Sequence, residues 1–164
     1  MPELLYNRSA AVAYAHRWAY SRNPNYYDFQ LLGGDCTNFC SQCLYAGLGV
    51  MNDTPEVGWY YYSLNDRAPA WTATEFFYRF LTRGQHSPGP YGIETALADC
   101  LAGDFVQLCF HGFEYSHTLI VVSAGAAENN ILLCAHSNDT DYTPLSSYSY
   151  KSVRYLHIAG GFSP

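Results

Sequence analysis

The sequence has few charged residues and no long apolar run. Charged residues make up 13% of its 164 positions, whereas hydrophobic residues make up 49%. The longest apolar run, Leu119 to Ala127, is about half of the roughly 20 residues that a membrane-spanning helix needs. Ala10–Ala15 is too short for the apolar core of a signal peptide. We therefore expect no membrane span and no export signal within these residues, which slightly favours a cytoplasmic location.

Basic residues are scarce as well. Eight Lys and Arg stand against 14 Asp and Glu, and the formal net charge is -6. Nucleic acid is therefore an unexpected partner, because binding it requires a surface that neutralises phosphates. The apolar fraction excludes a disordered chain, and 13 Gly with 8 Pro are too few for a collagen-like or low-complexity protein. With no internal repeat and no linker, we expect a single domain over residues 1–164.

The six cysteines do not predict a disulfide scaffold, since a chain of this length can be stabilised by its core. So many thiols would risk mispairing in an oxidising compartment, which slightly favours a reducing one. The spacing Cys36-x3-Cys40-x2-Cys43 matches that of iron–sulfur ligands in radical enzymes that use S-adenosylmethionine, but here the thiols share one helix face. Zinc is equally weakly supported, because no Cys-x2-Cys pair follows downstream. We expect neither a metal nor a cofactor.

The first half of the sequence has helical periodicity. Asn7 is a suitable N-cap, and Thr72 with Glu75 has the spacing of a capping box. The residue before a proline avoids the α region, so a helix is expected to stop at Asn23-Pro24. The predicted helical segments run from Asn7 to Asn23, from Asp35 or Cys36 to Gly47, from Thr72 to Gly84 and, as a short turn, from Ile93 to Cys100.

After Gly103 the pattern changes to short β-type runs bounded by Gly, Asn, Asp or Ser. The expected strands are Phe105–Phe110, Thr118–Ser123, Ile131–His136 and Ser152–Ile158. Helices followed by strands indicate an α+β fold, with N-terminal helices packed on a C-terminal antiparallel sheet of about four to six strands. This packing would bring the start of the second helix close to strand residues far along the chain.

Cys36 is the candidate nucleophile. It follows Gly33-Gly34-Asp35 at the start of a predicted helix, where unpaired N–H groups and the helix dipole favour a thiolate. The same N–H groups could hold an oxyanion. Alternatively, Cys36 begins an ordinary buried stripe that continues through Cys40 and Cys43.

His117 and His136 are the candidate partners of that thiol. His117 stands at the start of one predicted strand and His136 at the end of the next. If the two strands pair in antiparallel fashion through a turn at Gly125–Asn130, both rings lie at the same edge of the sheet. His117 would then act as the base and His136 as its orienting group.

Several strings in the sequence resemble the bacterial "putative amidase domain" family over nearly the whole chain. The most specific is Gly33-Gly34-Asp35-Cys36-Thr37-Asn38-Phe39. The other matching segments are Tyr6-Asn7-Arg8, Ala10-Ala11-Val12, Arg22-Asn23-Pro24, Ser41-Gln42-Cys43-Leu44, Trp59-Tyr60, Trp71-Thr72, Gly103-Asp104, His117-Thr118 and His136-Ser137.

The resemblance implies a papain-like fold related to cell-wall cysteine peptidases and CHAP-type amidases, with Cys36 and His117 at the catalytic positions. His136 is expected as the third catalytic residue, with Asn138 and Asp139 as alternatives. The backbone N–H of Cys36, with Asn38 or Gln30, would stabilise the oxyanion, while Asp35 would orient the helix start or bind a substrate amine. Trp59, Tyr60 and Trp71 either form an aromatic wall for a sugar or peptide or pack in the core and at its rim.

Two functions follow from these observations. The first is a cysteine amidase or peptidase that hydrolyses a peptide or peptidoglycan-like amide through an acyl-enzyme. The second is a catalytically inactive binding module on the same fold, which the 16 Tyr and three Trp favour, because amphipathic aromatics are enriched at recognition surfaces.

Overall fold

The first two long helices begin where the sequence predicts. The computed structural model describes all 164 residues. Helix α1 (Arg8–Trp18) is capped by Asn7, whose side chain accepts a hydrogen bond from the N–H of Ala10. Helix α2 (Cys36–Leu48) ends at Gly49, whose φ of 77° lets its N–H bond to the carbonyl of Tyr45. Helix α1 ends earlier than expected, and turns lead from Trp18 to Pro24.

The third predicted helix is broken in two, and its capping box is wrong. Helices α3 (Pro69–Thr72) and α4 (Thr74–Leu81) meet at Ala73, and no side chain caps α4. The two residues of the expected box serve tertiary contacts instead: Thr72 accepts a hydrogen bond from Arg67, and Glu75 accepts one from Arg154. No helix in the structure is both long and apolar enough to cross a membrane.

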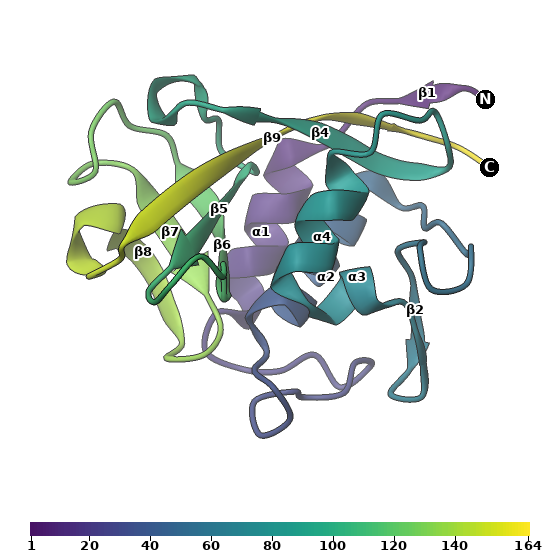
Figure 1. The fold of residues 1–164 in the computed structure, drawn as a ribbon, viewed down its shortest axis with the longest axis horizontal. Coiled ribbons are helices and arrows are strands. Elements are labelled where there is room, and N and C mark those ends of the chain that lie inside the picture. Colours follow the sequence, from purple (N-terminus) through teal and green to yellow (C-terminus); the bar gives the residue numbers. More distant parts are fainter.

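The strands form a seven-stranded sheet in which every pairing is antiparallel (Figure 1). Its order is β1-β9-β5-β6-β7-β8, and β4 also pairs with β9. The strands are β1 (Glu3–Leu4), β4 (Gly89–Thr95), β5 (Phe105–Cys109), β6 (His117–Ser123), β7 (Leu132–Ala135), β8 (Thr140–Pro144) and β9 (Ser152–Phe162). A separate hairpin joins β2 (Tyr61–Ser63) to β3 (Asp66–Arg67).

The α+β class and the antiparallel sheet are therefore confirmed, but three of the seven strands were not predicted. Strand β4 takes up the first part of the expected helical turn Ile93–Cys100, and only the 3₁₀ turn η1 (Leu97–Asp99) is helical there. Gly89, Pro90 and Gly92 are typical of turns, so the sequence does not indicate a strand here. A register shift between Tyr91 and Gly92 accommodates these residues in the sheet. Pairing with the long β9 is what makes this segment a strand.

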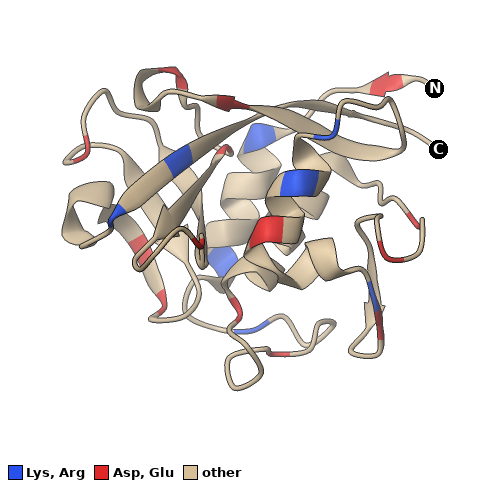
Figure 2. Ribbon diagram, in the orientation of Figure 1, with Lys and Arg blue, Asp and Glu red and all other residues tan.

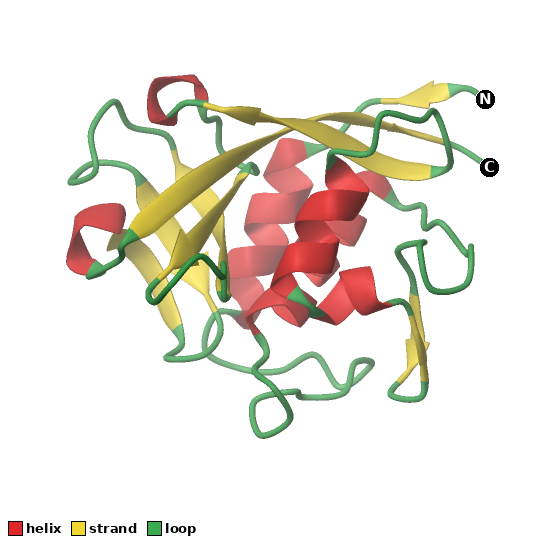
Figure 3. Cartoon of the chain, in the orientation of Figure 1, coloured by secondary structure: helices red, strands yellow, loops and turns green.

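The helices cover one face of the sheet (Figure 3), and the strand alternation places a second apolar cluster on the other face. Alternation along β6 shows the division: Ile120 and Val122 pack in the cluster that contains the helices, whereas Leu119 and Val121 pack in the second cluster. The 3₁₀ turn η2 (Leu145–Ser147) supplies Leu145 to that second cluster. The few charged residues are scattered over the ribbon, and no element carries a run of basic ones (Figure 2).

Candidate active site

Cys36 is the first residue of α2 and lines a cavity of about 400 Å³. Gly33 and Gly34 precede it with φ values of 86° and 97°, a left-handed conformation that side chains other than glycine rarely adopt. This turn aims the start of α2 at strand β6. Cys36 keeps 8% of its surface exposed. The charged residues around the cavity are Arg67, Glu75 and Glu114.

The thiol of Cys36 lies against the start of β6. Its sulfur is 3.9 Å from the carbonyl oxygen of Ser116 and 3.9 Å from Oγ1 of Thr37. Burial raises the pKa of this thiol above its ordinary value, although the N–H groups of Thr118 and Thr37 act in the opposite direction. The helix start therefore does not hold a preformed thiolate, and a nucleophilic role requires removal of the thiol proton by a base.

Asp35 ties the loop before Cys36 to the rest of the molecule. Its fully buried carboxylate accepts hydrogen bonds from the N–H of Phe29 and the side chain of Asn38. Its other oxygen lies 2.5 Å from Nδ1 of His136. The expected orienting role of Asp35 is consistent with these contacts, which come from the loop, the helix and the sheet.

His136 is on the same sheet face as the helices. Its ring stacks on Phe39 at 3.9 Å, and its Nε2 lies 2.7 Å from the carbonyl oxygen of Trp18. Nη1 of Arg22 lies 3.2 Å from the same Nε2, while Nδ1 faces Asp35. His136 therefore completes a buried pair with Asp35, and both of its ring nitrogens have polar partners within the protein.

His117 lies on the opposite face of the sheet. Its ring packs near Phe110 and Tyr148, with ring centroids 6.4 and 6.0 Å away, and both of these residues border the second apolar cluster. His117 does not line the Cys36 cavity. Burial lowers the pKa of this imidazole to about 4, so the ring is uncharged at neutral pH.

The strand register explains why the two histidines are not neighbours. Strands β6 and β7 pair in antiparallel fashion as expected, with Ile120 opposite Cys134. Continuing this register places Thr118, not His117, opposite His136. Adjacent residues of a strand face opposite sides of the sheet, so both histidines stand at the same edge but their rings point to different faces.

Comparison with known proteins identifies the family. The model of the family described as "Putative amidase domain" matches residues 5–159. The chain belongs to this family. A relative in Bacillus subtilis (strain 168), the uncharacterized protein YhbB, is 28% identical over 158 residues, an alignment covering 88% of this chain and 49% of that protein. The chain thus spans about half the length of this relative. No solved structure matches the chain.

The oxyanion side chains expected from the amidase-domain resemblance are not aimed at Cys36. Asn38 is buried, donates to the carbonyl of Tyr27 and to Asp35, and accepts from the indole N–H of Trp71. Gln30 is exposed outside the cavity, 3.4 Å from the hydroxyl of Ser137. The backbone N–H groups at the start of α2 remain as candidate donors, because no side chain caps this helix.

The expected aromatic wall is wrong for both tryptophans. Trp59 and Trp71 are fully buried, and their rings pack 4.5 Å apart in the main core. The indole N–H of Trp59 bonds to Ser41. Tyr60 is half-buried near Tyr62 and does not line the Cys36 cavity. The two indole rings do not reach the cavity because they are part of the core, where large aromatics supply much of the apolar area.

The alternative third residues also lie apart from His117. Asp139 pairs with Arg22 through two hydrogen bonds of 2.8 and 3.1 Å. Asn138 is exposed, with a positive φ of 65° in the turn between β7 and β8. Arg22 in turn lies 3.6 Å from Asp35, so Asp139 belongs to the charged group behind the Asp35–His136 pair.

The sequence did not indicate the polar residues that surround Cys36. Thr37 bonds to Thr118 at 2.9 Å and to Thr74 at 3.2 Å, and Gln107 donates to the carbonyl of Thr74. These residues come from α2, α4, β5 and β6 and have no shared motif. Only the Gly-Gly-Asp-Cys string marked this place in the sequence.

Proposed function

We propose that this chain is a cysteine-dependent amide hydrolase with Cys36 as its nucleophile. The single observation that supports this most strongly is the position of Cys36: the first residue of an uncapped helix, bordering a cavity, in a chain of an amidase-named family. The papain-like relationship and a peptide or peptidoglycan-like amide as substrate belong to the same proposal.

The reaction would proceed through a thioester. A base removes the proton of the Cys36 thiol as the sulfur attacks the amide carbonyl, and the carbonyl oxygen becomes an oxyanion facing the N–H groups of the first turn of α2. The C–N bond then breaks, and the proton leaves with the amine. Water attacks the thioester next, releasing the carboxylic acid and returning the proton to the thiol.

His117 remains the proposed base, because its ring is uncharged and neither nitrogen has a hydrogen-bond partner within the protein. His136 is a weaker choice, since Asp35 and the carbonyl of Trp18 occupy both of its nitrogens. For His117 to reach the sulfur, the start of β6, where His117 pairs with Leu108, would have to leave the sheet ladder and turn its ring to the other face. The nucleophile and the base therefore need separate tests.

Replacing Cys36 with Ala should abolish hydrolysis of peptidoglycan fragments or model amides. The measurement is release of the amine, followed by mass spectrometry. In a second measurement, an activated ester should leave one acyl group on Cys36 of the unmodified protein. The matched control is Cys100→Ala, which removes a buried thiol on the other face of the sheet and should retain activity. Undiminished hydrolysis by Cys36→Ala would refute the proposal.

His117→Gln should lower the rate of hydrolysis about 10²-fold or more if His117 is the base.

The second candidate is a binding module without hydrolytic activity. The observation that favours it is that neither imidazole lines the Cys36 cavity or hydrogen-bonds to its sulfur, together with the raised pKa of the thiol. Under this alternative the unmodified protein and Cys36→Ala bind a peptidoglycan fragment equally well, and neither cleaves it nor forms an acyl adduct.

A further inference from the structure

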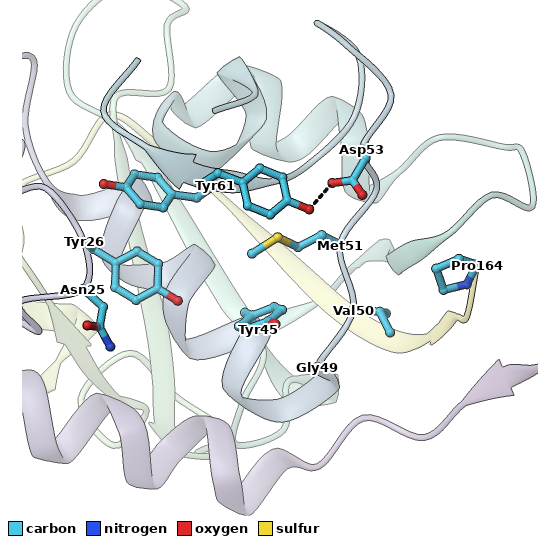
Figure 4. Close-up of a pocket in the computed structure, with 10 residues that line it drawn as sticks. Asn25, Tyr26, Tyr45, Gly49, Val50, Met51, Asp53, Tyr61 and Pro164 are labelled. Carbon is cyan, nitrogen blue, oxygen red and sulfur yellow. Dashed lines mark hydrogen bonds between the residues drawn. The ribbon is translucent and has the colours of Figure 1, made fainter. Parts of the chain in front are cut away.

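A second cavity, lined mainly by tyrosines, lies apart from Cys36. It measures about 480 Å³, within the range of small-molecule sites, and shares no lining residue with the Cys36 cavity. Its walls are Asn25, Tyr26, Tyr45, Gly49, Val50, Met51, Asp53, Tyr61, Tyr62 and Pro164. In Figure 4 the side chains of Tyr26, Tyr45 and Met51 gather around one opening, and Asp53 lies at its rim.

The tyrosines are held in place by core contacts. Tyr26 packs 5.0 Å from Tyr61 and 6.1 Å from Trp71, and Tyr45 is also 6.1 Å from Trp71. Tyr61 accepts a hydrogen bond from the N–H of Tyr27 through its hydroxyl. The rings therefore form a prearranged wall, which lowers the entropic cost of binding a ligand.

The electrostatics of this cavity favour a cation. Asp53 carries the only carboxylate among the lining side chains, and no Lys, Arg or His lines the cavity. One oxygen of Asp53 accepts a hydrogen bond from Tyr62 at 2.5 Å. Burial and the neighbouring Tyr45 and Tyr61 raise the pKa of Tyr26 to about 12, so its hydroxyl stays neutral. Aromatic faces attract organic cations, and a carboxylate adds to that attraction.

We propose that this cavity binds an organic ammonium group, held over the tyrosine rings and beside the carboxylate of Asp53. An anion would meet Asp53 in a chain that already carries a net charge of -6. A purely apolar ligand would leave the carboxylate unused. The inference concerns a separate site and does not rest on Cys36 chemistry, so it applies equally to the Cys36→Ala variant.

The test compares probes that differ only in charge. Nα-acetyl-lysine methylamide and tetramethylammonium are titrated into the protein and followed by amide NMR, with Nα-acetyl-norleucine methylamide and N-acetylglucosamine as uncharged probes. The two cations should shift signals around Met51 and Tyr61, and the uncharged probes should not. The same titration in Cys36→Ala should give the same dissociation constants.

Variants then assign the interaction to its residues. Asp53→Asn and Tyr45→Leu should each weaken binding of the cations by about two- to fivefold, the usual size of one exposed charge or cation–π contact. Tyr45→Phe keeps the ring and should bind as the unmodified protein does. Asp99→Asn is the matched control, because Asp99 is exposed and does not line the cavity. Thermal unfolding confirms that each variant is folded.

Four results would overturn the inference. Three of them are equal binding of the norleucine probe, binding of the sugar alone, and an equal effect of Asp99→Asn and Asp53→Asn. Absence of any shift with either cation at millimolar concentration would have the same consequence.

Discussion

At the scale of single residues, the site depends on which histidine reaches which partner. Asp35 and His136 are both almost fully buried and lie 2.5 Å apart, and Asp35 also holds the N–H of Phe29. A buried carboxylate costs free energy unless it is paired and hydrogen-bonded, and this one is both. The pair therefore fixes the position of Cys36 without needing to take part in proton transfer.

His117 should make the stability of the protein depend on pH in the mildly acidic range. Burial lowers its pKa to about 4, whereas an exposed histidine in the unfolded chain titrates near pH 6.5. Between these values the unfolded chain binds a proton that the folded chain does not. The contribution of His117 to the free energy of unfolding is thus complete above about pH 6.5 and falls by roughly 3 kcal/mol as the pH drops to 4.

This dependence can be isolated with His117→Gln, which does not titrate. Urea unfolding at several pH values between 7.5 and 4.5 should show the unmodified protein losing stability faster than the variant as the pH falls. The control is His86→Gln, which removes an exposed histidine and so tests whether the effect is specific to His117. A constant difference between His117→Gln and the unmodified protein across this range would contradict the expected burial.

At the scale of elements, helix α2 combines a strong stop signal with an uncapped start. Gly49 closes it with a φ of 77°, while Asp35 at the other end directs its side chain to the loop and the sheet instead of the helix N–H groups. The end of the helix therefore follows from local chemistry. Its start follows the local Gly33-Gly34 turn and is held in place by the contacts of Asp35 with Phe29 and His136.

Gly49→Ala should lower the free energy of unfolding by about 1 kcal/mol, because a left-handed conformation is strained for alanine. A Cβ at Gly49 would meet no atom within 4 Å, so the loss reports conformation and not a clash. Gly84 is the matched control: it has the same open surroundings but no positive φ. In urea unfolding, Gly84→Ala should be close to neutral, and equal losses at the two positions would contradict this explanation.

At the scale of the whole molecule, burial distinguishes Cys36 from the other five cysteines. All six are free thiols, but only Cys36 borders either of the two cavities or keeps as much as 8% of its surface exposed. Cys40 and Cys43 are completely buried in the main core beneath α2. Their regular spacing in the sequence therefore reflects one buried helix face.

A small alkylating reagent should modify Cys36 first and leave the other thiols intact until the protein unfolds. The raised pKa of Cys36 means that labelling should be slow at mildly acidic pH and faster at alkaline pH. Peptide mapping by mass spectrometry measures both the site and the rate. Labelling of Cys100 or Cys109 at a similar rate in the folded protein would contradict the burial described above.

The sequence by itself determined the elements whose signals are local. Asn7 and Gly49 mark helix ends through their own backbone chemistry, and the four runs after Gly103 are strands because β-type residues alternate or cluster there. Strands β1, β4 and β8 could not be predicted in this way. They are short or contain glycine and proline, and their pairing partners supply the hydrogen bonds that define them.

Only the tertiary structure decided the composition of the candidate site. The position of Cys36 at a helix start was evident in Gly-Gly-Asp-Cys, and its cavity followed once α2 packed on the sheet. The face to which His117 points depends instead on a one-residue register between β6 and β7, which no local pattern encodes. A shift of one residue exchanges the two faces of a strand. Whether Thr118 or His117 lies on the same face as the sulfur is therefore decided only when the sheet is assembled.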